Sequence, residues 1–290
     1  MWRPSFDEVK GPGYLCFRAR DKPVQPLKEQ LCYELEQLFS HPCRYTRDTE
    51  TWKEVFAVSS VRFLPAIVLL VLRVLCAAAQ VTVLTFSLLR GWEILYFFTT
   101  WTNMLVAVYF VGLSLCSAAA FLVPSRPVNQ RLTGENMRLK NSDDVGLLPV
   151  PLRLMESVSS VALGASFVTC VVYWSALSPT AEHINHWTSY YEHACFIPLF
   201  IMALISRIPY RLQHLWLSIV FAAAYSSLCI IIAFVPLTTW HGRVGYVYNG
   251  LNYQKNPIEA WLVTGVFTTV LPPLSYLLFW FVFRFNNPQP

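Results

Sequence analysis

Long apolar stretches follow one another along the chain, separated by shorter polar segments. Each is close to or longer than the roughly 20 residues that an α-helix needs to cross the hydrocarbon core of a bilayer. Such runs predict membrane-spanning helices, because a helix satisfies its backbone polar groups internally. We therefore predict an all-α fold, a polytopic membrane bundle of about six transmembrane helices. The predicted spans are residues 62–88, 94–123, 152–177, 188–206, 212–236 and 258–283.

The chain before the first predicted span has a different pattern. The stretch "QPLKEQLCYELEQLF" (25–39) carries leucines at helical spacing, which predicts a short amphipathic helix. Such a helix lies either on the protein's own membrane domain or on the lipid surface, or it binds a partner. We divide the chain into an N-terminal region with this helix, a six-helix transmembrane domain and a short tail, at residues 1–55, 56–285 and 286–290.

Composition and charge agree with a membrane protein and predict its orientation. The chain has 290 residues, of which 55% are hydrophobic and 13% charged, and its mean hydropathy is +0.43. If the N-terminus is cytoplasmic, eighteen of the 22 Lys and Arg residues lie on the cytoplasmic side and three on the opposite side. The positive-inside rule then predicts that both termini are cytoplasmic. The expected location is the plasma membrane or the endoplasmic reticulum.

Unusual polar residues open the second predicted span. "YFFTTWTNM" (96–104) has three threonines and an asparagine within five residues. In the predicted topology the second and fourth spans both enter from the exoplasmic side, which brings Thr100 and His193 to a similar depth. Two interpretations stay open for these residues. They pack helices together, since threonine bonds to its own helix and small residues allow close approach, or they form a functional site, the usual role of ionisable groups inside spans.

Other features of the spans predict structure rather than chemistry. Arg73 lies in the first span with no Asp or Glu deep in the spans to pair with, so we expect it to bond backbone carbonyls or contact lipid. Pro272 and Pro273 lie within the last span and predict a kink with freed carbonyls. The segment between the fifth and sixth spans combines glycines with aromatic residues. It predicts either an ordered exoplasmic cap or an interfacial aromatic anchor.

No cofactor, metal or nucleic-acid site is predicted. The histidine-containing loop before the fourth span has HxxH spacing but no set of sulfur ligands, so we do not assign a metal to Glu182, His183 and His186. His193 and His214 are predicted on opposite sides of the membrane and cannot share a haem. Motifs for nucleotide binding, serine hydrolysis or nucleic-acid recognition are not found. The partners expected are membrane lipids, and the sequence identifies no protein partner.

Three stretches carry a resemblance to a known family. They read "YFFTTWTNMLVAVYFVG", "YEHACFIPLFIMALISRIPYRLQHLWL" and "HGRVGYVYN". The chain resembles the rolling stone proteins over roughly residues 60–285, and it is more distantly similar to the androgen-induced gene and androgen-dependent regulator group. Members of the androgen-induced branch are intramembrane threonine hydrolases of fatty acid esters, whereas the rolling stone branch is linked to myoblast fusion.

The resemblance implies a pair of catalytic residues. The androgen-induced branch has its nucleophilic threonine twelve residues before the glycine of a Phe-Gly pair, and Gly112 follows Thr100 by twelve. Its catalytic histidine precedes a proline by five residues, as His193 precedes Pro198. Thr100 is thus implied as nucleophile and His193 as general base, with Thr99 as the alternative nucleophile. The expected activity is hydrolysis of a lipid ester, and the alternative is a non-catalytic membrane protein in cell adhesion, fusion or a membrane complex.

Overall fold

The computed structural model of the 290-residue chain describes residues 26–40, 56, 59–61, 64–122, 150–177, 187–206, 208–235 and 245–284. Within these ranges the regular elements are all helices, so the predicted all-α bundle is confirmed. Five of the helices are long and apolar enough to cross a membrane, and a shorter apolar helical stretch runs from Tyr190 to Ile205. The chain is therefore a multi-pass integral membrane protein.

The helices follow the predicted segments closely. The elements in chain order are α1 (Leu27–Ser40), α3 (Ala66–Leu88), η1 (Trp92–Tyr96), α4 (Phe98–Leu122), α5 (Val150–Val172), η5 (Tyr173–Leu177), α7 (Trp187–Ala194), α8 (Phe196–Ile205), η6 (Leu212–His214), α9 (Leu215–Phe234), η8 (Asn249–Leu251), α10 (Pro257–Gly265), η9 (Val266–Val270) and α11 (Leu271–Phe283). The fourth predicted span is α7 and α8 together, interrupted at Cys195.

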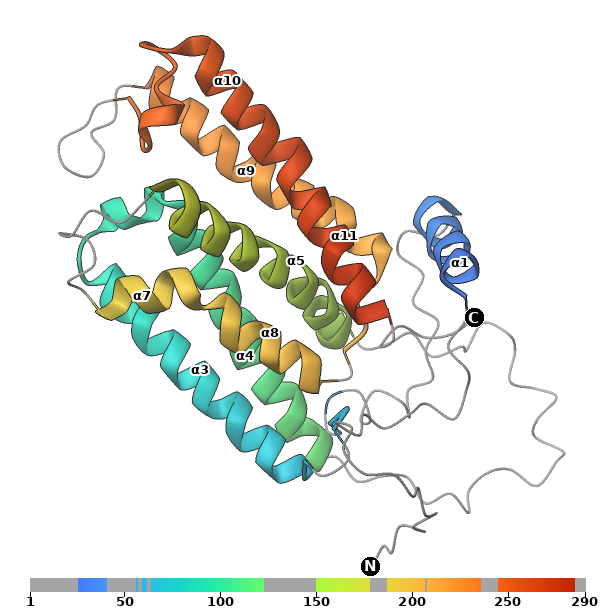
Figure 1. Ribbon diagram of the computed structural model, residues 1–290. Coiled ribbons are helices and arrows are strands. Elements are labelled where there is room, and N and C mark those ends of the chain that lie inside the picture. The colour runs from blue at the N-terminus through green and yellow to red at the C-terminus, as the bar shows by residue number, and fades with distance from the viewer. Residues whose placement is uncertain are drawn as a thin grey trace, which may run out of the picture.

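Helix α5 holds the bundle together (Figure 1). It contacts α4 and α8 on one side and α9 and α11 on the other. It is also the most enclosed of the five long spans. In its apolar 18-residue stretch 61% is buried inside the protein, against 28–39% in the other four. We call the end of the bundle that carries α1 and the end of α11 the terminus side, and the end that carries η1 and residues 245–256 the loop side. The charge count predicts that the terminus side is cytoplasmic.

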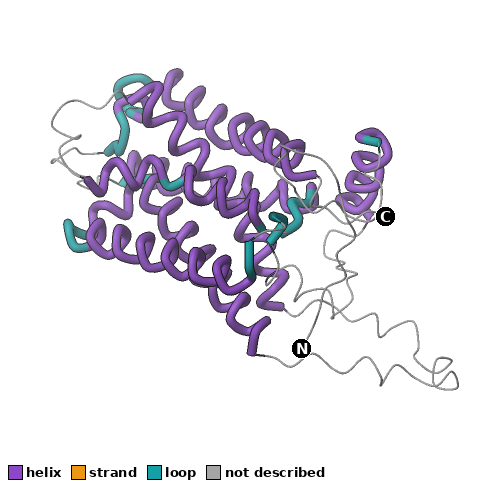
Figure 2. The backbone as a smooth tube through the Cα atoms, turned by 60° about the horizontal axis from the view of Figure 1, so that its bottom comes forward, coloured by secondary structure: helices purple, strands orange, loops and turns teal. Residues whose placement is uncertain are grey.

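Helix α1 docks on the terminus side of the bundle, as both ribbon views indicate (Figures 1 and 2). It contacts η6, and the buried Gln30 donates from Nε2 to the carbonyl of Arg284 at 2.9 Å. Leu31 packs against the main core, whereas Leu27 and Leu35 stay exposed. Of the alternatives for this amphipathic helix, the structure therefore has α1 on the protein's own membrane domain.

Arg73 is fully buried in α3 and bonds oxygen atoms of three separate segments. Its guanidinium donates to the carbonyl of Phe56, to the hydroxyl of Ser117 and, at 2.8 Å, to the hydroxyl of Ser206. Ser206 caps the carboxyl end of α8, where the helix dipole is negative. The expectation that this arginine bonds backbone carbonyls is met, and its charge is offset by oxygen dipoles and a helix end.

The last span is broken where the sequence predicts a kink. A π-helical turn, η9, separates α10 from α11 immediately before Pro272 and Pro273. Each proline lacks an N–H, and its ring crowds the carbonyl four residues earlier, which widens the helix at this point. The hydroxyl of Thr268 in η9 bonds that of Ser226 in α9 at 2.7 Å. The break is therefore held by a neighbouring helix.

The described part of the segment before α10 forms an ordered cap on the loop side. Gly245 has a positive φ of 81°, which a glycine adopts without strain. Val247 and Tyr253 are buried, and Tyr248 packs against Phe97 at the start of the second span. Tyr225 in α9 donates its hydroxyl to the carbonyl of Tyr96 at 2.8 Å. Of the two interpretations of this segment, the structure has the cap for residues 245–256.

Candidate functional site

The polar residues of the second span lie in the first two turns of α4. A glycine with φ of 136°, Gly91, turns the chain after α3, and the short helix η1 leads into α4 at Phe98. Thr100, Thr102 and Asn103 are all buried, with exposed fractions of 4%, 0% and 2%. Buried hydroxyl and amide groups need partners in a membrane. The partners of Thr102 and Asn103 come from α3, α5 and α7.

Asn103 is the centre of a hydrogen-bonded network between three helices. Gln80 of α3 donates from Nε2 to the side-chain oxygen of Asn103 at 2.9 Å and to its backbone oxygen at 3.2 Å. Asn103 donates from Nδ2 to the backbone oxygen of Glu192 in α7 at 3.5 Å. The network therefore joins α3, α4 and α7 on the loop side of the bundle.

Glu192 brings a carboxylate into the same network. Its exposed fraction is 8%, and its Oε1 accepts from the hydroxyl of Ser87. Arg90, in the turn after α3, lies 3.9 Å from the same oxygen. The cation and the hydroxyl thus both face the same carboxylate oxygen at the edge of the bundle. Nothing in the sequence pattern predicts that Glu192 pairs with Ser87 and Arg90.

A second pair of hydroxyls joins α4 to α5. Thr102 and Thr169 are both buried, and their Oγ1 atoms lie 3.1 Å apart. Thr169 also donates to its own helix, at the carbonyl of Ala165. Thr102 was grouped with the polar residues of the second span, whereas Thr169 carries no signal in the sequence, because a lone threonine in an apolar helix is common.

His193 lies at the end of α7 and stacks on the π-helical turn at the end of α5. Its ring is parallel to that of Tyr173, with an interplanar angle of 5° and centroids 3.3 Å apart. The Nδ1 atom of His193 is buried and has no hydrogen-bond partner among the described residues. π-Helical turns occur often at functional sites. In the described part of the chain, no hydrogen bond joins His193 to Thr99 or Thr100.

The register of α4 orients the two threonines differently. Successive residues of a helix are rotated by about 100°. Asn103 is bonded to α3 and α7, and Thr102 is bonded to α5. Viewed down the helix axis, Thr99 therefore lies between Thr102, which points to α5, and Asn103. Thr100 lies beyond Asn103, on the side of α4 that faces α3. Since His193 is held between α7 and the end of α5, the register favours Thr99 as its neighbour.

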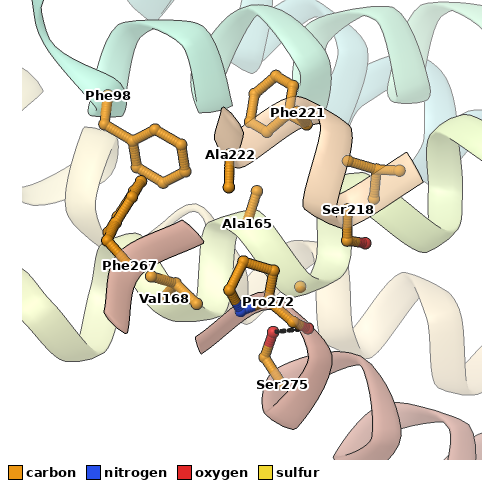
Figure 3. A pocket seen from close by; sticks show the side chains of 11 residues that line it. Phe98, Ala165, Val168, Ser218, Phe221, Ala222, Phe267, Pro272 and Ser275 are labelled. Carbon is orange, nitrogen blue, oxygen red and sulfur yellow. Dashed lines mark hydrogen bonds between the residues drawn. The ribbon is translucent and has the colours of Figure 1, made fainter. Parts of the chain in front are cut away.

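An apolar cavity lies next to the start of α4 (Figure 3). Phe98 and Phe267 of η9, whose ring centroids lie 4.7 Å apart, line one end of it, and Pro272 of α11 lies further along its wall. The cavity holds about 10 Å³, which is room for about one water molecule. The hydroxyl of Ser275 in its wall donates to the carbonyl of Pro272 at 3.0 Å. A second cavity beside Tyr210 holds about 20 Å³. Neither accommodates a lipid without movement of the helices.

His214 does not join this site. His214 lies in η6 on the terminus side, where its Nδ1 is 3.3 Å from the hydroxyl of Ser160. Glu182, His183 and His186 lie outside the described residues. Within the described residues, no group of three His, Cys, Asp or Glu side chains is placed to hold a metal ion.

Comparisons with known proteins add no constraint on the site. Searches against protein-family models, curated proteins and solved structures gave no match for this chain.

Proposed function

We propose that this multi-pass membrane protein hydrolyses lipid esters within the bilayer. In this proposal a threonine at the start of α4 is the nucleophile, Thr100 by motif match and Thr99 as its alternative, and His193 is the general base. The observation that carries the proposal is the buried Nδ1 of His193, which has no hydrogen-bond partner among the described residues. A buried nitrogen without a partner is costly, and a catalytic role is one of the explanations for such an exception in a native structure.

The surroundings of His193 support the same assignment. The stacked Tyr173 ring holds the imidazole in one orientation, and the Asn103–Glu192 hydrogen bond fixes α7 against the turns of α4 that carry the threonines. A base must lie within hydrogen-bond reach of its nucleophile, and this contact can tighten only when substrate is bound. The resemblance to the rolling stone and androgen-induced families supports the choice of a threonine–histidine pair.

The chemistry balances without a cofactor. The threonine Oγ1 attacks the ester carbonyl while His193 takes the hydroxyl proton. The C–O bond to the alcohol then breaks, and the alcohol leaves with that proton. Water attacks the acyl-threonine in turn, gives its proton to His193, and releases the fatty acid as the threonine hydroxyl is restored. An acyl chain already dissolved in the bilayer would reach the site from the side, between helices.

The test is ester turnover by the purified full chain in liposomes. Wild type, Thr99→Ala, Thr100→Ala and His193→Gln are compared with a long-chain fluorogenic ester as substrate. Removing the general base should lower the rate about 100-fold or more, and one of the two threonine variants should lose activity to a similar degree. Loss in Thr99→Ala alone would assign the nucleophile as the helix register favours, and loss in Thr100→Ala alone would assign it as the motif implies.

A matched control separates chemistry from folding. Thr85 is exposed on α3, and its hydroxyl donates to its own helix at the carbonyl of Val81. Thr85→Ala should keep wild-type turnover, and each inactive variant should elute as a monodisperse species in size-exclusion chromatography. Turnover that survives in His193→Gln and in both threonine variants would overturn the proposal.

A second candidate function is favoured by the pairing of the polar residues with one another. The contacts Gln80–Asn103, Asn103–Glu192 and Thr102–Thr169 satisfy these groups without a substrate. We propose on this basis, as the alternative, a non-catalytic membrane protein in adhesion, fusion or a membrane complex, in which the polar groups fasten helices together. Wild-type protein that turns over no lipid ester, while its folding depends on Gln80, would support this alternative.

A further inference from the structure

A buried ion pair lies on the terminus side, far from the loop-side network. Glu156, near the start of α5, has an exposed fraction of 0%, and its Oε2 is 3.7 Å from Nε of Arg211. The neighbouring groups are polar as well. Ser160, one turn further along α5, contacts His214, and Tyr210 donates to the carbonyl of Ser160 at 2.9 Å. This end of the bundle therefore contains a second polar site, in which the sequence analysis placed no function.

Within α5, η6 and the end of α11, the described arginines outnumber the carboxylates. Arg153 lies three residues before Glu156 on α5, so both side chains project from one face of the helix. Arg284 follows the end of α11, which is the terminus-side end of that helix. Glu156 pairs with Arg211, and one carboxylate balances one guanidinium. The described residues of α5, η6 and the end of α11 thus hold more arginines than carboxylates at this end, while α1 carries both acidic and basic residues.

Two buried donors at this site have no acceptor among the described residues. Gln213, with an exposed fraction of 3%, lies in η6 between Arg211 and His214, and its Nε2 has no hydrogen-bond partner. The Nε of Arg153 is likewise buried without a partner. A buried donor left unpaired is costly, and a cation more so. The site is therefore rich in donors and needs an acceptor with several oxygens.

Helix α1 covers the site. It packs on η6, the turn that contains Gln213, and Gln30 fastens it to the carbonyl of Arg284. Figure 1 shows α1 beside the ends of α9 and α11. The helix shields the donors from bulk water, and the exposed Leu27 and Leu35 of its other faces remain available to lipid. The site thus lies under an amphipathic helix at the level where lipid head groups meet the bundle.

We propose that this cluster binds a phosphate group, through Arg153, Arg211 and Gln213, beneath α1. Phosphate offers several acceptor oxygens with negative charge, and the planar guanidinium of arginine matches it with paired hydrogen bonds. The phosphate belongs either to the head group of an anionic lipid, such as phosphatidic acid, or to free inorganic phosphate. The position at the ends of the spans and the predicted cytoplasmic orientation fit the leaflet that carries anionic lipids.

The experiment is binding to the full chain in detergent, followed by native mass spectrometry and thermal unfolding. Phosphatidic acid, phosphatidylcholine and inorganic phosphate are titrated separately. Wild type should retain phosphatidic acid, or be stabilised by phosphate, in preference to phosphatidylcholine. Because a hydrogen bond to a charged group contributes enough for about a 10-fold change in affinity, Arg153→Gln and Gln213→Leu should each weaken binding about 10-fold.

A second charge variant keeps the proposal testable. Lys255 is exposed on the loop side, and Lys255→Gln removes the same charge as Arg153→Gln. This control should bind like wild type. Retention of phosphatidic acid alone identifies a lipid head group, and stabilisation by inorganic phosphate alone identifies the free anion. Equal binding by wild type, Arg153→Gln and Lys255→Gln, or binding of neither ligand by wild type, overturns the proposal. Turnover of lipid esters does not enter this test.

Discussion

The closest approach of α4 and α5 depends on the absence of a side chain at Gly112. A Cβ atom on Gly112 would overlap the Sδ atom of Met155 and lie 2.8 Å from its Cε. Gly265 in α10 offers the opposite situation, because nothing lies within 4 Å of an added Cβ and its backbone is helical. Gly112→Ala and Gly265→Ala therefore make the same chemical change in a crowded and in an open place.

The expected difference between the two variants in the free energy of unfolding follows from two contributions. Replacing glycine by alanine inside a helix stabilises it by about 1 kcal/mol. At Gly112 the added methyl group must displace the end of the Met155 side chain. Because that side chain is flexible, we expect the low end of the overpacking cost, about 1 kcal/mol. The helix contribution is common to both variants and cancels in their comparison. We expect Gly112→Ala to be about 1 kcal/mol less stable than Gly265→Ala.

The assay is reversible unfolding of the purified protein in mixed micelles by increasing SDS, followed by circular dichroism. Gly265→Ala should unfold at or above the SDS fraction of wild type, and Gly112→Ala below that of Gly265→Ala. The double variant Gly112→Ala/Met155→Ala should recover part of the loss, because the smaller side chain makes room for the methyl group. Equal stability of the two single variants would contradict the close contact of α4 with α5.

Three further predictions use the same protein preparation. Gln80→Leu should lower the free energy of unfolding by about 0.6–1.7 kcal/mol, the range of hydrogen bonds between membrane helices, while Thr85→Ala on the exposed face stays within about 0.5 kcal/mol of wild type; equal effects in SDS unfolding would refute the network. Tyr225→Phe removes the donor to the carbonyl of Tyr96 and should lower the free energy of unfolding by about 1 kcal/mol. Tyr190→Phe, at an exposed site, should leave it close to that of wild type. Gln30→Ala should speed hydrogen exchange of the Leu27–Ser40 amides, and the exposed Lys28→Ala should not; unchanged exchange in Gln30→Ala would contradict the docking of α1.

Hydrophobic length alone was enough to predict the helices of the bundle. Segments such as 62–88 and 94–123 differ from the helices Ala66–Leu88 and Phe98–Leu122 by only a few residues. This works because a bilayer imposes one minimum length on every span. The prolines at Pro272 and Pro273 were also informative, since a missing N–H disrupts any helix. The fourth span is interrupted at Cys195, three residues before Pro198, whose ring crowds the carbonyl four residues earlier, at Ala194.

The sequence pattern could not predict which residues are the hydrogen-bond and stacking partners of the polar side chains. Thr100, Asn103 and His193 stood out as polar residues in apolar segments, but nothing in their spacing named Gln80, Thr169 or Tyr173 as neighbours. These pairs depend on which face each helix turns toward its neighbours. Because the spans are apolar on most faces, the sequence pattern does not determine that orientation. Glu156 lies close to the start of its predicted span and was not recognised as part of a buried ion pair. Only tertiary packing brings Arg211 to it.

The most direct test of the proposed catalytic site is to locate the covalent adduct of a reactive lipid analogue. Wild-type protein is treated with a long-chain fluorophosphonate, and the modified peptide is sequenced by mass spectrometry. We predict phosphonylation within residues 96–104, on Thr99 or Thr100, with loss of labelling in His193→Gln. Labelling at any other residue, or labelling of the threonine that persists in His193→Gln, would contradict it.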